Sequence, residues 1–160
     1  MNNNIQNSAD NPGVVAPPPL IYAIPLLAGI LLHLASPRKF LPFSPIARVL
    51  GVICVGTGMA TISAGFRTMR QAGTNIDPRQ PATTVVTSGP FRFTRNPLYL
   101  SLALLYSGIA LFLNSAWPML FLPFVLTIMN RGVIDREEHY LEGKFGTEYL
   151  NYKTQVRRWL

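Results

Sequence analysis

Two pairs of hydrophobic segments are joined by a polar loop that ends in Ser88-Gly89-Pro90-Phe91-Arg92-Phe93-Thr94-Arg95-Asn96-Pro97-Leu98-Tyr99. Gly89-Pro90 is typical of a turn. Asn96 is a good helix N-cap, and Pro97 suits the first helical position, where no backbone N–H is needed. The stretch therefore predicts a turn followed by the start of an apolar helix. Its two arginines would then lie at the edge of a membrane.

The composition indicates an integral membrane protein. Charged residues make up 13% of the 160-residue chain and hydrophobic residues 49%, whereas soluble domains carry about 25% charged residues. The net charge of +7 is spread over residues that flank apolar segments, which favours anionic lipid headgroups over nucleic acid as a partner. The single cysteine, Cys54, cannot form a disulfide within the chain, and no Cys/His cluster has the spacing of a metal site.

Four apolar segments predict an all-α integral membrane protein with about four transmembrane helices. They cover residues 20–36, 46–66, 97–113 and 117–134. About 20 apolar residues are enough to cross the bilayer core, and the last two segments are expected to form an antiparallel hairpin. Residues 1–19 are rich in Asn and Pro and predict a disordered or loosely attached tail. Residues 20–160 then form a single domain.

Small residues recur along the second predicted span. Ala47 and Gly51 are four residues apart, as are Ala60 and Ala64. This spacing allows membrane helices to approach closely, so we expect both pairs to lie at helix contacts.

The basic residues predict which side of the membrane each polar region faces. Four spans place residues 1–19, the 67–96 loop and the C-terminal segment on one side. The basic residues of the loop and the C-terminal segment are Arg67, Arg70, Arg79, Arg92, Arg95, Arg131, Arg136, Lys144, Lys153, Arg157 and Arg158. The opposite side has only Arg38, Lys39 and Arg48. The positive-inside rule predicts that the loop and the C-terminus face the cytoplasm, where they can meet and form a site.

The chain becomes charged and aromatic after residue 130. We expect the fourth helix to leave the membrane and continue to about Lys144, Gly146 to end it, and a short amphipathic helix to follow over 147–156. Helical spacing places Asp135, Glu138 and Glu142 on one face with Arg131.

Glu137 falls on a more apolar face of the same helix, beside Ile134 and Leu141. A carboxylate there needs a protein cation or a polar group of a ligand. The alternative for the Glu137-Glu138 pair is a solvated face with local salt bridges.

The arginines of the opening stretch also have two interpretations. Arginines at a membrane boundary often anchor at headgroups, and this is the simpler role for Arg92. Arg95 directly precedes the predicted helix start, whose positive end favours anions, and it lies one turn before Tyr99. Tyr99 is either a site residue or a packing residue. Spacing and composition alone lead to a polar cytoplasmic site of unknown ligand.

Residues 87–99 resemble the Gly-Pro-Tyr-x-x-x-Arg-His-Pro-x-Tyr motif of the isoprenylcysteine carboxyl methyltransferase family, to which phospholipid N-methyltransferases are related. The second signature of that family is also present, in the same order along the chain. Its residues are Glu137-Glu138, Leu141, Phe145-Gly146, Tyr149 and Tyr152. The resemblance covers about residues 83–160.

The resemblance implies a membrane methyltransferase that uses S-adenosylmethionine at the cytosolic mouth of the bundle. An amphiphilic or lipid-modified substrate would enter sideways from the bilayer. The positions expected to contact the cofactor are Thr83, Thr84, Val85, Val86, Phe91, Asn96, Pro97, Leu98, Tyr99, Glu137 and Glu138. Glu137 suits the ammonium or the ribose hydroxyls of the cofactor, and Arg95 or the helix start suits its carboxylate. Methyl transfer is a direct displacement, and a carboxylate acceptor would need no general base.

The candidate catalytic residues are Arg95, Tyr99 and Arg131. Arg131 is expected to hold a substrate carboxylate at the membrane boundary, while Val133 stands at the position of the family's substrate arginine. Other departures from the family pattern are Asn96 for histidine, Phe91 for tyrosine and Ser101 for glycine, and these leave the methyl acceptor open.

Two further functions fit parts of the sequence. Sterol reductases have a similar C-terminal region, so a membrane reductase with a nicotinamide cofactor is one alternative, although the phosphates of that cofactor would need more cations in the loop. The other alternative is a non-enzymatic membrane protein that keeps the fold.

Overall fold

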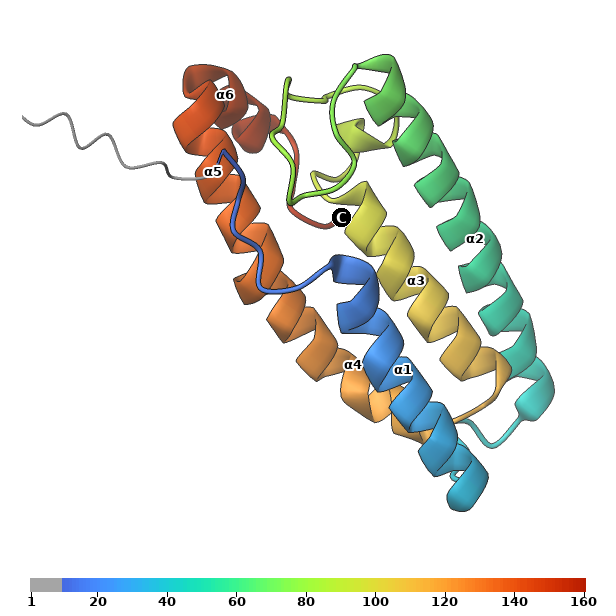
Figure 1. Ribbon diagram of the computed structural model, residues 1–160. Helices are drawn as coiled ribbons and strands as arrows, with labels where there is room; N and C mark the ends of the chain where they lie inside the picture. Colours follow the sequence, from blue (N-terminus) through green and yellow to red (C-terminus); the bar gives the residue numbers. More distant parts are fainter. Residues whose placement is uncertain (1–9) are drawn as a thin grey trace, which may run out of the picture.

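The structure is a computed structural model that describes residues 10–160, and this part of the chain is all-helical, without a strand (Figure 1). The helices are α1 (Pro18–Ala35), α2 (Ser44–Gln71), α3 (Pro97–Phe112), α4 (Ala116–Met129), α5 (Asp135–Phe145) and α6 (Thr147–Gln155), with a 3₁₀ turn η1 (Gly89–Arg92) and a π-helical turn η2 (Asn130–Ile134). The predicted fold class is confirmed.

Three helices are long and apolar enough to cross a membrane: α1, α2 and the continuous helix Ala116–Phe145. The predicted third span, α3, has 16 residues and a length of about 24 Å at ~1.5 Å per residue, short of the ~30 Å hydrocarbon core. The count of four spans therefore stays a prediction. Helix α2 continues to Gln71, beyond its predicted end at residue 66, and Arg70 in its last turn complements the negative helix end.

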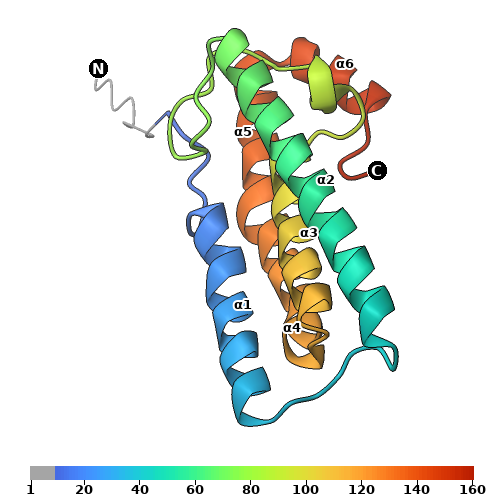
Figure 2. The same ribbon diagram turned by 90° about the vertical axis from the view of Figure 1, so that its right-hand side faces the viewer.

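Helix α3 lies at the centre of the bundle, with α2 on one side and α1 and α4 on the other (Figures 1 and 2). The core is built from Tyr22, Tyr106, Val125 and Met129, among others. The buried Tyr106 hydroxyl donates a hydrogen bond to the carbonyl of Pro118 at 2.8 Å. The one polar group of this buried tyrosine is therefore paired with backbone at the start of α4, as a hydroxyl inside an apolar bundle requires.

Small residues set the distance between α2 and α3. A Cβ atom on Gly51 would lie 2.6 Å from the backbone nitrogen of Phe112, and one on Gly65 would lie 2.6 Å from Leu98 Cδ2. Gly58 faces α3 in the same way. The expected contact of Ala47 and Gly51 is confirmed, since both are buried.

The second predicted pair, Ala60 and Ala64, is exposed, so that expectation was wrong. The helix contact follows Gly51, Gly58 and Gly65 instead. These residues are seven positions apart, which is about two helical turns, and so they stay on one face over a longer distance than a four-residue pair does.

The N-terminal segment differs from the predicted tail. Residues 1–9 lie outside the described part, but residues 10–17 run along α5 and helix α1 already begins at Pro18. The Val15 N–H donates to the Gly132 carbonyl at 3.1 Å, Arg136 donates to the Gly13 carbonyl at 2.7 Å, and Lys144 binds Asp10 at 2.7 Å. These partners are more than 100 residues away in the chain, so local composition gives no sign of them.

The polar loop after α2 and the C-terminal helices lie at the same end of the bundle (Figure 1). Helix α5 ends at Phe145, Gly146 takes a positive φ of 53°, and α6 follows. The predicted break and the predicted short helix are confirmed, and two regions distant in the sequence are brought together.

We expect Gly51→Ala to destabilise the protein by about 1–3 kcal/mol, because the new methyl group would overpack against the backbone of α3. The matched control is Gly56→Ala on the same helix, where a Cβ atom meets nothing within 4 Å. Apparent melting temperatures in detergent measure both. Equal melting temperatures for the two variants would contradict the close approach.

Candidate functional site

A cavity opens between the polar loop, the start of α3, α5 and α6. Eleven of the thirteen predicted site residues line it. They are Thr84, Val85, Val86, Phe91, Arg95, Asn96, Pro97, Leu98, Tyr99, Glu137 and Glu138. The walls are mostly apolar, and the charged lining residues are Asp77 from the loop, Arg95 from the segment before α3, and Glu137 and Glu138 from α5.

Two predicted residues lie away from the cavity wall. Thr83 is bound within the loop: its N–H donates to Thr74 Oγ1 at 3.1 Å and its hydroxyl to the Gly73 carbonyl at 3.0 Å. Arg131 is exposed on the π-helical turn η2 and does not line the cavity. A role of Arg131 inside the cavity is therefore not supported by its position.

Glu137 faces the cavity from α5 and is half-buried. The hydroxyl of Tyr99, in the first turn of α3, donates a hydrogen bond to Glu137 Oε1 at 2.7 Å. Over residues 10–160 the structure gives Glu137 no ion pair, so its negative charge is not matched by a protein cation. The expected need for a partner is met in part, by a neutral hydroxyl.

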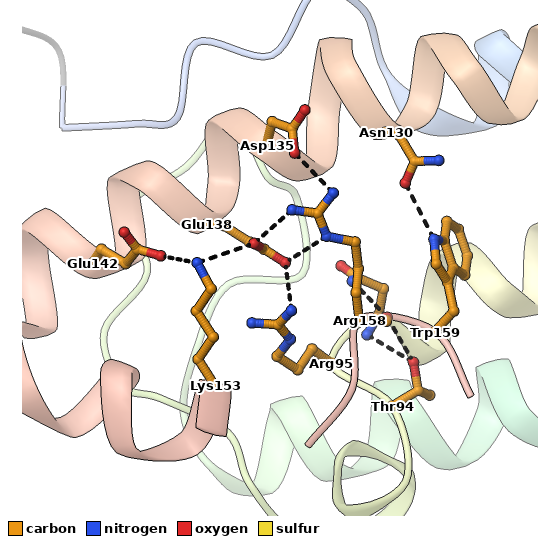
Figure 3. A network of polar contacts seen from close by, with 10 residues as sticks. Thr94, Arg95, Asn130, Asp135, Glu138, Glu142, Lys153, Arg158 and Trp159 are labelled. Atoms are coloured by element: carbon orange, nitrogen blue, oxygen red, sulfur yellow. Dashed lines mark hydrogen bonds and ion pairs between the residues drawn. The ribbon is translucent and has the colours of Figure 1, made fainter. Parts of the chain in front are cut away.

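Glu138 is 5% exposed and lies in a network of charges (Figure 3). Arg158 binds it through two parallel contacts, Nε to Oε1 at 3.0 Å and Nη2 to Oε2 at 2.8 Å. Arg95 Nη2 lies 3.2 Å from Oε1, and Lys153 Nζ lies 3.6 Å from Oε2. A solvated position, the alternative for this residue, is wrong, because three cations surround its carboxylate.

The helical face predicted for Asp135, Glu138 and Glu142 is confirmed. Asp135 binds Arg158 at 2.9 Å, and Glu142 binds Lys153. Arg131, predicted on the same face, takes no part in this network.

Arg95 has unused hydrogen-bond donors beside the cavity. Its side chain is 9% exposed, and its single ion pair within the described chain is with Glu138. Nε and Nη1 are buried and lack a hydrogen-bond partner. Buried polar groups are nearly always paired in native proteins. The guanidinium therefore favours an additional acceptor, such as a carboxylate of a ligand.

Asn96 directly precedes helix α3, which begins at Pro97 as predicted. It stands at the N-cap position, but its side chain makes no capping hydrogen bond. The Nδ2 group donates instead to the Arg158 carbonyl at 2.9 Å. The cap position is therefore confirmed, but the capping bond is replaced because the C-terminal segment brings an acceptor to this side chain, a partner of which the sequence around residue 96 contains no sign.

Sequence reasoning missed several residues of the site. Arg158 and Lys153 form ion pairs with Glu138. In the sequence, the only sign of these pairs is that two basic residues follow the acidic helix, on the predicted short helix and in the tail. Tyr152 donates from α6 to the Phe91 carbonyl at 2.7 Å, and burial raises its pKa, so the hydroxyl stays a neutral donor. Asp77 lines the cavity, and hydrogen bonds from Arg79 lower its pKa.

Comparison with known families shows to which family the chain belongs. The model of the phospholipid methyltransferase family matches residues 46–148, which include nearly all of α2, then η1, α3, α4 and α5, and the part of the cavity wall that these elements and the loop form. The chain belongs to the phospholipid methyltransferase family. This family is part of a group of membrane methyltransferases that resemble isoprenylcysteine carboxyl methyltransferases, so the family resemblance seen in the sequence is confirmed.

One similar protein is an uncharacterized protein of Haemophilus influenzae, which is 44% identical over 63 residues. The match covers 39% of this chain and the whole of that protein. No solved structure matches the chain.

We expect Glu138→Gln to destabilise the fold by about 3 kcal/mol, because it leaves Arg95 and Arg158 without their shared buried carboxylate. Glu148→Gln, a matched change at an exposed residue of α6, should have an effect near zero. Thermal unfolding in detergent measures both. A loss no larger than that of the control would mean that the network contributes little.

Proposed function

We propose that this membrane methyltransferase uses S-adenosylmethionine, bound in the cavity between the loop, α3, α5 and α6. One observation carries the proposal: the cavity wall has a carboxylate without a cation, on Glu137, and a guanidinium with unused donors, on Arg95. The amino-acid end of S-adenosylmethionine carries an ammonium and a carboxylate, which match these two groups in charge.

The residues present fit this cofactor. Glu137 would accept from the ammonium or the ribose hydroxyls, with its carboxylate held by the Tyr99 hydroxyl at 2.7 Å. Arg95 would donate to the carboxylate through Nε or Nη1. The apolar part of the wall, with Phe91 and Leu98, would cover the adenine. The residues that complete the wall in this assignment are Thr84, Val85, Val86, Asn96, Pro97 and Glu138. Thr83 would act only by fixing the loop, through its bonds to Thr74 and Gly73.

S-adenosylmethionine supplies an electrophilic methyl group on a sulfonium when it is bound. The protein would act by holding the two reactants in line and by excluding water from the cavity. Fixed side chains serve this purpose best, and Tyr99 and Arg95 are both fixed, the first by Glu137 and the second by Glu138.

The acceptor would be a carboxylate or another polar group of a lipid or a lipid-modified molecule that arrives from the bilayer. Arg131 is exposed beside the apolar part of its helix. We assign it to the approach of an anionic acceptor group, outside the cavity wall.

The cavity gives less support to a nicotinamide-dependent reductase. Among the described lining residues, Arg95 is the one basic side chain, and the phosphates of a dinucleotide favour several cations or a row of backbone N–H groups. A non-enzymatic protein would have no need for an unmatched carboxylate in a cavity, because such a group costs stability.

We expect the detergent-purified protein to bind S-adenosylmethionine, and Glu137→Ala to weaken binding about tenfold or more, since a charge-assisted hydrogen bond is lost. Tyr99→Phe should have a smaller effect, because it removes only the group that holds Glu137. Isothermal titration calorimetry measures the affinities, with Glu148→Gln as the control. Absence of binding by folded wild-type protein would refute the proposal, and unchanged affinity in both variants would move the site elsewhere.

We further propose that the cavity faces the cytoplasm, as the basic residues around it favour. In a bacterial host, green fluorescent protein fused after Leu160 should fluoresce, and alkaline phosphatase fused there should be inactive. The reverse pattern would place the cavity on the opposite side.

A further inference from the structure

The C-terminal segment after α6 is bound along the stretch that carries Arg95. The Arg95 N–H donates to the Arg157 carbonyl at 2.9 Å. The next carbonyl, of Arg158, accepts a hydrogen bond from Thr94 Oγ1 at 3.0 Å (Figure 3). It accepts a second one from Asn96 Nδ2 at 2.9 Å. Three consecutive residues directly before α3 thus form hydrogen bonds to two consecutive residues of the tail.

The tail itself is held from its other side. Arg158 binds Glu138 through two nitrogens and Asp135 through the third. The indole N–H of Trp159 donates to Asn130 Oδ1 at 3.2 Å, and its ring packs against the core. The tail therefore connects helix α5 and the π-helical turn to the segment that supplies Arg95.

Arg95 and Arg158 share one carboxylate. Both touch Glu138 Oε1, Arg95 through Nη2 at 3.2 Å and Arg158 through Nε at 3.0 Å. Because Arg158 has the shorter and two-pronged contact, it takes up most of the negative charge of Glu138. Arg95 is then oriented by Glu138 but keeps part of its positive charge and its two unpaired nitrogens.

We propose that Arg158 is a positioning residue for Arg95: it neutralises Glu138 and fixes residues 94–96, so that Arg95 can recognise the carboxylate of the bound cofactor. The inference rests on the proposed use of S-adenosylmethionine. It gives the C-terminal tail a role in ligand recognition, although Arg158 does not line the cavity.

Loss of the Arg158 side chain has a specific consequence. Glu138 would keep Arg95 and the more distant Lys153 as partners, so its charge would fall mainly on Arg95. A guanidinium neutralised in this way binds a second carboxylate less well. The other contacts of the ligand, at Glu137 and the apolar wall, would be unaffected, since Arg158 touches neither.

The test compares two ligands that differ only in the group that Arg95 would bind. These are S-adenosylmethionine and decarboxylated S-adenosylmethionine, which lacks the α-carboxylate. Calorimetry in detergent gives the affinity ratio of the two ligands for the full-length wild-type protein and for the variants Arg158→Met, Arg158→Lys and Arg157→Met. The last is a matched control, because Arg157 is exposed and its substitution leaves the backbone carbonyl in place.

We expect wild-type protein to prefer the carboxylated ligand about tenfold. Arg158→Met should abolish most of this preference while binding of the decarboxylated ligand changes less than twofold. Arg158→Lys should restore part of the preference, and Arg157→Met should keep all of it. If Arg158→Met does not fold, the affinity ratio of the two ligands is measured on Arg158→Lys instead. Lysine keeps the charge but loses the two-pronged contact, so this variant should show a smaller preference than wild-type protein.

The outcomes separate this inference from the proposed function. An equal loss of affinity for both ligands in the Arg158 variants would show a purely structural role and overturn the inference. Wild-type protein that binds both ligands equally would also overturn it, while the proposed cofactor would stand. Wild-type protein that binds neither ligand would refute the proposed function and, with it, the inference.

Discussion

The buried carboxylate of Glu138 imposes the main constraint on the polar end of this protein. An unpaired buried charge is very costly, and removal of a single partner from such a group typically costs several kcal/mol. Glu138 is matched by Arg95 from the start of α3, Lys153 from α6 and Arg158 from the tail. The need to compensate one charge thus brings three segments together, and the cavity is the space left between them and the loop.

The adjacent residue shows the opposite arrangement. Glu137 points to the cavity and has a hydroxyl as its partner, whereas Glu138 is surrounded by cations. Two carboxylates next to each other in the sequence thus have different roles, because a helix turns them about 100° apart. One stabilises the architecture, and the other is left available to a ligand.

Much of this organisation was predictable from the sequence. Long apolar segments, Gly146 and the charged helix after residue 130 indicated the helices, and the two motifs contain eleven of the 24 residues that line the cavity. The errors concern long-range contacts: Asn96 binds a carbonyl 62 residues away, and residues 13 and 15 bind α5 and η2. Ala60 and Ala64 were misplaced because a four-residue spacing does not specify which face of a helix meets its neighbour.

The short length of α3 affects how deep in the bilayer the cavity would lie. Its first turn carries Tyr99 and so forms part of the cavity wall, and its 16 residues extend about 24 Å to the far turn. A full bilayer span is ~30 Å. Measured from the far turn, the first turn of α3 is therefore roughly one helical turn short of the length that crosses the hydrocarbon core. Under the proposed function, a lipid acceptor would present its polar end at that depth while its chains stay in the bilayer.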